Sequence, residues 1–385
     1  MADIFDNEEI DKDTVEEEEL DQLFPENYNL LTEKAVSLKK SYINKLHGTK
    51  SLKLAVSVSD GSIEVYELNN SSLDQVCRLS GHRGAVGGVV FSPREDHLLY
   101  SAGQHGVVKL WDTRASGSCV QEYKEEEDKE IKPFECLDVS CNGRVICAGS
   151  QLVKDDAFLV FWDQKMPKPL GGYWNSHTED ITQVKFHKEK PETLATGSSD
   201  GLMNIFNITE PTEDDALIYS LNVENSVDKL SWLDEKVAAV ITQSNDLQTW
   251  DTEAGDMLRS YSRDKVAKSI KRSKHDDCYL VDAFTARDGA HVLLAGSYGG
   301  DGSCLRSVTL GDKKLRARTT LRGNTQTVSC SWYQQDKDIL VTTGEGGVIS
   351  VWARPPSPAP APAAPAVEKL TIRESKKGAH RHKPY

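Results

Sequence analysis

The chain has 385 residues, 38% apolar residues, eight cysteines and a formal net charge of −14 at pH 7. No apolar stretch approaches the roughly 18 residues that cross a bilayer, and the acidic N-terminus does not look like a basic export signal. No two cysteines form a C-x-x-C pair, which excludes a cysteine zinc cage and a disulfide scaffold. We therefore expect an intracellular protein of the cytoplasm or nucleus, with reduced thiols and no membrane contact.

The charge is concentrated at the two ends of the chain. Residues 1–29 carry twelve acidic residues and one lysine, whereas residues 353–385 carry seven basic and two acidic residues after a Pro/Ala-rich start. Such segments bury too little apolar surface to offset chain entropy. The sequence thus predicts a disordered acidic arm over 1–29, one folded domain over 30–352, and a Pro/Ala linker with a disordered basic tail over 353–385. Residues 1–25 are expected to be dispensable for folding.

Between the ends, one pattern recurs about every 45 residues: an apolar strand, small residues, a tight turn, and an alternating strand that ends in an aromatic residue. The copies end at Tyr66, Trp111, Trp162, Phe206, Trp250 and Trp352, with intervals of 45, 51, 44, 44 and 102 residues. A degenerate copy around His291–Ser297 fills the double interval. The chain therefore contains seven repeats.

A period of 40–45 residues with four short strands is typical of a β-propeller, because each small sheet buries both faces only when the ring closes. These repeats, with Gly81-His82 and Ser176-His177 opening two of them, resemble the WD-repeat family over nearly all of residues 30–352. The resemblance implies an all-β, seven-bladed propeller. It also implies an N-terminal strand that completes the last blade, for which the alternating residues 34–40 are the candidate.

The resemblance further implies hydrogen-bonded sets made of a loop His, a Ser or Thr, a turn Asp and a Trp. The fourth repeat supplies His177, Thr196 and Asp200, and has Phe206 at the Trp position. The second repeat supplies His82, Ser101 and Trp111, with His105 in place of the acid. The seventh repeat has Asn324 and Gly346 at the His and Asp positions and is expected to rely on packing alone.

Catalytic and metal motifs have no supporting context. The segment 197–201 satisfies G-x-S-x-G, but a nucleophile elbow needs a following helix and an alternating strand follows here. The glycine cluster 296–302 lacks the order of a phosphate-binding loop, and the ten histidines show no metal-ligand spacing. We expect no enzyme activity, no catalytic residue, no cofactor, no metal and no small-molecule substrate.

Binding of partners at the protein surface is the remaining kind of function, and the family resemblance implies which loop positions make the contacts. In well-known members these are the third and fifth residues after the loop His and the residue before the turn Asp. Carried onto this sequence, the positions are Ala85, Gly87, Gln104, Asp180, Thr182, Ser199, Ser226, Asp228, Asn245, Thr327, Ser329 and Glu345. Other proteins are the expected partners, and the acidic arm is expected to engage a basic one. Direct nucleic-acid binding is disfavoured because the propeller segment is itself acidic.

Two functions remain open at this point. The first is a non-catalytic scaffold, monomeric by itself, inside an intracellular complex such as one for ribosome assembly or a nuclear complex. In that case the basic tail would serve as a nuclear or nucleolar address. The alternative is a substrate receptor of a cullin-RING ubiquitin ligase, because the segment from Trp111 to Arg114 resembles the docking box of some WD-repeat proteins.

Overall fold

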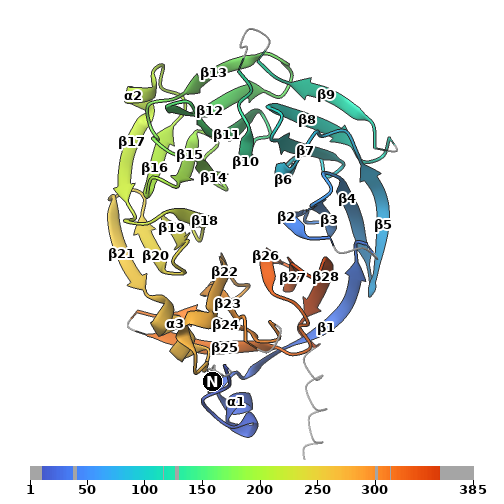
Figure 1. Ribbon diagram of the computed structural model, residues 1–385, viewed down its shortest axis with the longest axis vertical. Helices are drawn as coiled ribbons and strands as arrows, with labels where there is room; N and C mark the ends of the chain where they lie inside the picture. Colours follow the sequence, from blue (N-terminus) through green and yellow to red (C-terminus); the bar gives the residue numbers. More distant parts are fainter. Residues whose placement is uncertain are drawn as a thin grey trace, which may run out of the picture. The chain divides into compact units, whose positions relative to one another are not determined.

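A computed structural model describes residues 11–37, 41–115, 117–125, 130–299, 302–312 and 314–355. Its strands form five four-stranded sheets and one eight-stranded sheet. The eight-stranded sheet consists of two blades joined by one shared strand, so the described chain forms seven blades around a central channel (Figure 1). The prediction of an all-β, seven-bladed propeller is confirmed.

The strands follow one another blade by blade, each blade running from its innermost to its outermost strand. Blades 1 to 3 are β2 (Ile43–Gly48), β3 (Lys53–Val58), β4 (Ile63–Asn69), β5 (Ser72–Leu79); β6 (Val86–Phe91), β7 (Leu98–Gly103), β8 (Val107–Asp112), β9 (Cys119–Tyr123); β10 (Phe134–Val139), β11 (Val145–Val153), β12 (Asp156–Asp163), β13 (Pro169–Tyr173). Blades 4 and 5 are β14 (Ile181–Phe186), β15 (Thr193–Ser198), β16 (Leu202–Asn207), β17 (Leu217–Asn222); β18 (Val227–Trp232), β19 (Val237–Thr242), β20 (Leu247–Asp251), β21 (Asp256–Tyr261). Blades 6 and 7 are β22 (Cys278–Thr285), β23 (His291–Ser297), β24 (Leu305–Leu310), β25 (Leu315–Leu321); β26 (Val328–Gln334), β27 (Ile339–Gly344), β28 (Val348–Ala353) and β1 (Glu26–Ala35).

The apolar core lies between neighbouring blades. One cluster joins Tyr100 and Leu110 of blade 2 to Leu137, Ile146 and Trp162 of blade 3. Because the second and third strands of a blade are covered on both faces, they read as nearly continuous apolar runs rather than as simple alternation. This packing makes each blade depend on its neighbours.

Strand β1 closes the ring by pairing with two blades. Residues 26–28 run parallel to β25 of blade 6, and residues 29–35 run antiparallel to β28 of blade 7. An N-terminal strand therefore completes the last blade, but it begins earlier than the candidate 34–40: β1 starts at Glu26, and only residues 34 and 35 of the candidate pair with β28. Val36 N donates to Gly347 O at 3.0 Å, and residues 38–40 lie outside the described part. The alternation of apolar and polar residues favoured residues 34–40, whereas the edge strand β28 pairs with residues 29–35.

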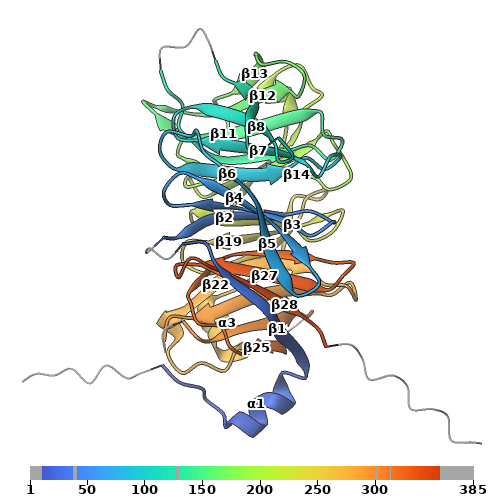
Figure 2. The same ribbon diagram turned by 90° about the vertical axis from the view of Figure 1, so that its right-hand side faces the viewer.

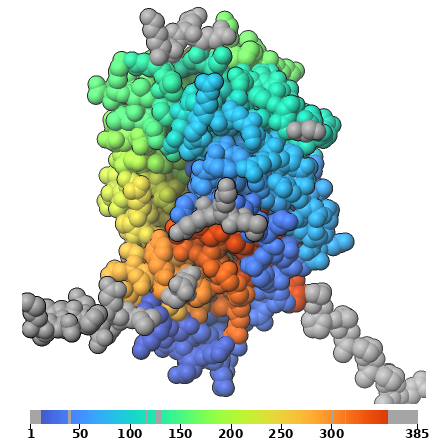
Figure 3. All heavy atoms as spheres, turned by 45° about the vertical axis from the view of Figure 1, so that its right-hand side comes forward, coloured from blue at the N-terminus to red at the C-terminus, as the bar shows by residue number. Residues whose placement is uncertain are grey.

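The expectation of a disordered arm over residues 1–29 is wrong for residues 11–29. Helix α1 (Glu17–Leu23) precedes β1, and Leu20 and Phe24 are buried. Figures 2 and 3 show this segment in dark blue, packed against the orange strands of blade 6. Charge counting missed this docking because the segment finds basic partners on the propeller. Residues 1–10 and 356–385, on which the other predictions for the ends fall, lie outside the described part.

Three short helical segments complete the described chain: α2 (Glu213–Ala216), α3 (Arg263–Ser269) and the 3₁₀ turn η1 (His275–Asp277). Helix α3 and η1 interrupt the connection between blades 5 and 6, where the repeat is degenerate. None of the described helices is long and apolar enough to cross a membrane.

Candidate interaction face

The seven innermost strands all begin at the same end of the central channel, which we call the channel mouth. Each innermost strand pairs antiparallel with the second strand of its blade, so the second strand ends at the mouth as well. The tight turn after the second strand and the loop before the innermost strand therefore meet there. This topology brings positions about 20 residues apart in every repeat to one rim.

Blade 4 holds a histidine-centred set of three members, because Phe206 stands at the Trp position and offers no indole donor. His177 is 3% exposed, with Nδ1 3.0 Å from Asp200 Oδ2 and Nε2 2.8 Å from Thr196 Oγ1. Asp200 also accepts hydrogen bonds from the Thr178 and Leu202 backbone N–H groups. Burial raises the pKa of Asp200, but the hydrogen bond and charge of His177 outweigh it and hold that pKa below its ordinary value. The turn needs Gly201, whose φ is +83°.

Blade 2 holds an incomplete set. His82 Nε2 lies 2.6 Å from Ser101 Oγ, which also accepts a hydrogen bond from Trp111 Nε1 at 2.8 Å. Without the turn acid, the buried Nδ1 atoms of His82 and His105 have no hydrogen-bond partner among the described residues. Burial, followed by the charges of His105 and Lys109, lowers the pKa of His82 to about 3. The structure thus shows the physical consequence of losing the acid.

Blade 7 does not rely on packing alone, so that expectation is wrong. Asn324 is buried and donates to the carbonyl oxygens of Gly302 and Gln326, both at 2.7 Å. Gln326 in turn binds the next turn, because its Oε1 accepts from Gly346 N at 3.1 Å. Trp352 Nε1 donates to Thr342 Oγ1 at 2.9 Å. Amides here replace the His and Asp that the sequence lacks.

The predicted partner-binding residues of blades 2, 4, 5 and 7 lie around the mouth, and several contact one another. Ser226 Oγ donates to Ser199 O at 3.0 Å, and Glu345 N donates to Thr327 O at 3.1 Å. Gln104 N likewise donates to Ala85 O at 3.1 Å. The structure thus brings these loop positions to one rim, as the family pattern requires.

Several of these side chains form hydrogen bonds to main-chain groups inside the propeller. Thr182 Oγ1 reaches Val227 O at 2.6 Å, Asp180 Oδ1 accepts from Leu152 N at 2.7 Å, and Asn245 Oδ1 accepts from Leu280 N at 2.9 Å. Buried or half-buried groups with such hydrogen bonds stabilise the contacts between blades, and the bonded atoms are not free to bind a ligand. Ser329, whose Oγ lies 3.4 Å from Ile43 O, is of the same kind.

Two acidic side chains at the mouth are available for a partner. Asp228 is half-buried and Glu345 is exposed, and neither carboxylate has a hydrogen bond or ion pair with the described residues. Tyr298, 51% exposed, lies within the electrostatic reach of both: burial and then the charge of Glu345 raise its pKa, the charge of Arg263 lowers it, and the charge of Asp228 raises it further. The mouth therefore presents carboxylates next to an aromatic ring.

Sequence reasoning missed Tyr298 and Glu135. Both occupy positions that the family pattern marks, since Tyr298 follows β23 as Ser199 follows β15, and Glu135 is the second residue of β10 as Thr182 is of β14. Glu135 accepts a hydrogen bond from Gln104 Nε2 at 3.3 Å. Carrying the pattern onto blades 3 and 6 would have found them.

Arg114 lies away from the mouth. It follows β8, which starts at the mouth and ends at the opposite rim, and its side chain is 65% exposed. Its guanidinium makes a 2.8 Å ion pair with Asp112, and the hydrogen bond to Arg114 lowers the pKa of Asp112 to about 2. No group of three or more metal-ligating side chains occurs in the described part.

The seven blades, the mouth and the histidine-centred sets are the features of a WD-repeat propeller, and the sequence is similar to the WD-repeat family. The WD40 model (WD domain, G-beta repeat) matches residues 73–112 and 316–353. The sequence resembles WD repeat-containing protein 89: a homolog of that protein from Dictyostelium discoideum is 25% identical over 82% of this chain and 84% of its own length.

Two other relatives cover different shares of the chain. WD repeat-containing protein GTS1 from Arabidopsis thaliana is 28% identical over 60% of this chain and 57% of its own length. An uncharacterized WD repeat-containing protein from Schizosaccharomyces pombe is 21% identical over 78% of this chain and 91% of its own length. WD-repeat proteins are generally non-catalytic scaffolds for protein interactions.

Proposed function

We propose that this protein is a non-catalytic scaffold that binds a basic segment of a partner protein at the channel mouth. The observation that carries the proposal is the group of carboxylates without internal partners, Asp228 and Glu345, beside the exposed ring of Tyr298. Carboxylates with an aromatic face suit lysine and arginine side chains, which form ion pairs and stack on rings. The proposed setting is an intracellular complex in the cytoplasm or nucleus, such as one for ribosome assembly.

Helix α1 offers a second acidic surface to the same kind of partner. Glu16, Glu18 and Glu19 are exposed on the docked segment, whereas Glu17 and Asp21 pair with Arg322. Docking holds this charge in a fixed place on blade 6. Its contribution to binding should fall with salt, because exposed charges are screened beyond about 8 to 10 Å.

The test is binding of a fluorescent arginine- and lysine-rich peptide, followed by anisotropy at low and at physiological ionic strength. The double variant Asp228→Asn/Glu345→Gln should bind at least tenfold more weakly than the wild type. The matched control is Asp256→Asn/Glu235→Gln, which removes two charges from exposed acids outside the mouth and should bind as the wild type does. Equal loss in both variants would mean that only overall charge matters, and would remove the mouth as the site.

The second candidate function is a ubiquitin-ligase substrate receptor, and the exposure of the Arg114 guanidinium favours it. Its test is capture of a purified ligase adaptor by the full chain. Arg114→Ala should abolish capture while peptide binding at the mouth persists. Adaptor capture that survives this substitution removes the docking role of Arg114.

A further inference from the structure

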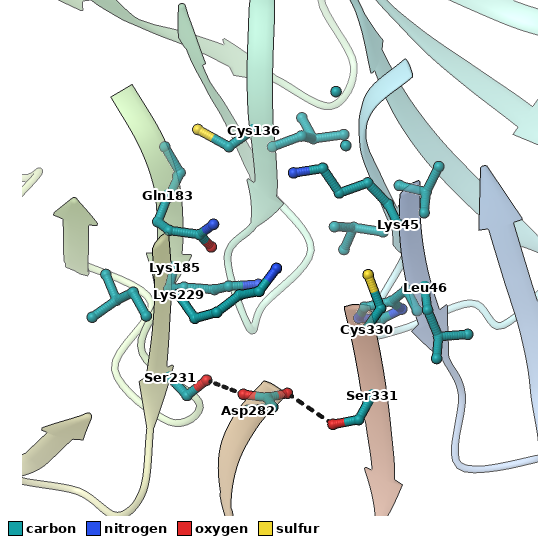
Figure 4. A pocket seen from close by; sticks show the side chains of 18 of the residues that line it. Lys45, Leu46, Cys136, Gln183, Lys185, Lys229, Ser231, Asp282, Cys330 and Ser331 are labelled. Carbon is teal, nitrogen blue, oxygen red and sulfur yellow. Dashed lines mark hydrogen bonds between the residues drawn. The ribbon is translucent and has the colours of Figure 1, made fainter. Parts of the chain in front are cut away.

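The central channel contains a cavity of about 120 Å³ that all seven innermost strands line. The walls include Gly87 and Gly88 of blade 2, which pack closely against β10 of blade 3, and polar side chains of most other blades. Figure 4 shows the cavity from close by.

The cavity is lined by three lysines and one carboxylate. Lys45, Lys185 and Lys229 come from blades 1, 4 and 5, and Asp282 from blade 6. Figure 4 shows Lys45 reaching into the cavity from one wall and Lys185 and Lys229 from the opposite wall. When all four groups are ionised, the lining carries two more positive than negative charges, inside a strongly acidic chain.

The nearby carboxylates do not pair with these lysines. Asp282 Oδ1 accepts from Ser231 Oγ at 2.9 Å and from Ala283 N at 2.8 Å, and its Oδ2 lies 3.3 Å from Ser331 Oγ. Asp138, outside the lining, accepts from the backbone N–H groups of Val139 and Phe186. Asp228 and Glu135 act on the lysines only through their charge. No carboxylate of the described residues lies within ion-pair distance of the three ammonium groups.

Unpaired ammonium groups in a narrow channel are costly, because burial removes their water and their like charges repel. Burial, followed by the charge of Lys229, lowers the pKa of Lys45. Burial also lowers the pKa of Lys229, but the charges of Cys330, Asp228 and Asp282 outweigh it and raise that pKa. A bound anion would offset both the loss of water and the repulsion. The three donors converge from different blades, which suits a ligand with several acceptor oxygens rather than a flat carboxylate.

We propose that the channel cavity binds a small tetrahedral oxyanion of the phosphate or sulfate class, held by Lys45, Lys185 and Lys229. Ser231 and the Gln183 amide also line the cavity and would add hydrogen bonds. This site does not depend on the proposed scaffold role, because it lies inside the channel and not on the carboxylates of the mouth.

The experiment titrates the full chain with inorganic phosphate, followed by phosphorus NMR line broadening and by thermal unfolding, with chloride at equal ionic strength as the reference. Sulfate should compete with phosphate, whereas phosphoserine should bind at least tenfold more weakly if the ligand is the free anion. Equally tight phosphoserine binding would assign the site to a phosphoryl group of a larger ligand. Absence of saturable binding to the wild type overturns the proposal.

Two variants locate the site, Lys45→Gln and Lys229→Gln, with the exposed Lys165→Gln as the matched control. Each channel variant should weaken phosphate binding at least tenfold, and the control should leave it unchanged. In chloride alone, Lys45→Gln should melt at or above the wild-type temperature, because repulsion is relieved, and phosphate should reverse that order. Unchanged affinity in both channel variants would mean an adventitious surface anion only, and would also overturn the proposal.

Discussion

Blade 4 takes the carboxylate of its polar set from its own turn, whereas blade 6 receives one from the N-terminal segment. In blade 4, Asp200 lies 23 residues after His177. In blade 6, the buried carboxylate of Asp11 accepts a hydrogen bond from Ser297 Oγ, 286 positions away, and packs against Gly299. A repeat that loses its own acid can thus regain one from a distant part of the chain.

The N-terminal segment also brings ion pairs with arginines, which the turn acid of blade 4 does not have. Asp11 Oδ2 lies 2.7 Å from Arg272 Nε and its Oδ1 accepts from Lys274 N at 2.9 Å, while Asp13 pairs with Arg272 and Arg306. Burial raises the pKa of Asp11, but the hydrogen bonds from Ser297, Lys274 and Arg272 outweigh it and lower that pKa. The segment is therefore part of the fold, and deleting residues 1–25 should unfold blade 6 rather than leave it intact.

The largest expected effect is that of Asp11→Ala, which should lower the free energy of unfolding by about 3–5 kcal/mol, because Arg272 keeps a buried charge that has lost a partner. The measurement is urea unfolding. The control is Asp21→Ala, which removes an exposed ion pair with Arg322 and should cost at most about 1 kcal/mol. Similar midpoints for the two variants would show that the segment only rests on the surface.

Asp200→Ala should cost about 1–3 kcal/mol, because it leaves the buried His177 without one partner and opens the turn. His105→Ala at the equivalent turn of blade 2 should cost less, since no acid is lost there. Thermal unfolding of both variants checks the order. If they lose stability equally, the hydrogen bond between His177 and Asp200 does not govern the turn.

Acid should loosen the propeller through its histidines before it releases the N-terminal segment. Burial lowers the pKa of both His82 and His47 to about 3 in the folded state. Each is therefore neutral when folded, so stability is complete above the unfolded value of about 6.5 and falls toward pH 3 by about 1.4 kcal/mol per pH unit for each histidine. The pKa of Asp11 is lowered in the folded state, so ionised Asp11 stabilises the fold fully until the pH falls below the unfolded value of about 3.9.

Unfolding free energies between pH 7 and pH 4.5 test this order. His82→Gln should flatten the pH dependence relative to the wild type, and His275→Gln, in the surface turn η1, should not. An unchanged slope in His82→Gln would falsify the assignment of acid sensitivity to that buried ring.

The smallest expected effect is a gain. His105→Asp gives blade 2 the acid that blade 4 has, so that His82 Nδ1 acquires a partner, and should stabilise the protein by about 0.5–1.5 kcal/mol. A thermal melt beside His105→Ala separates the new hydrogen bond from mere removal of the second imidazole. A variant no more stable than His105→Ala would show that the turn cannot place the carboxylate.

The sequence by itself determined the number of blades and most of the mouth. The interval of about 45 residues between strand-ending aromatics is local information, and so is the spacing of His177, Thr196 and Asp200, because each set closes within one repeat. The same repeat register marks Glu135 and Tyr298, which could have been predicted once blades 3 and 6 were aligned.

Only the tertiary structure decided the contacts between distant segments. The pairing of Asp11 with Arg272, the register of β1 against β28, and the meeting of Lys45, Lys185 and Lys229 in the channel join residues that no local pattern links. From sequence alone, an acidic run is predicted to be solvated, because its basic partners lie far away in the chain. A lysine on an innermost strand is likewise predicted to be exposed, because only closure of the ring surrounds it. Ring closure is the physical step that turns these separate residues into buried pairs and a charged cavity.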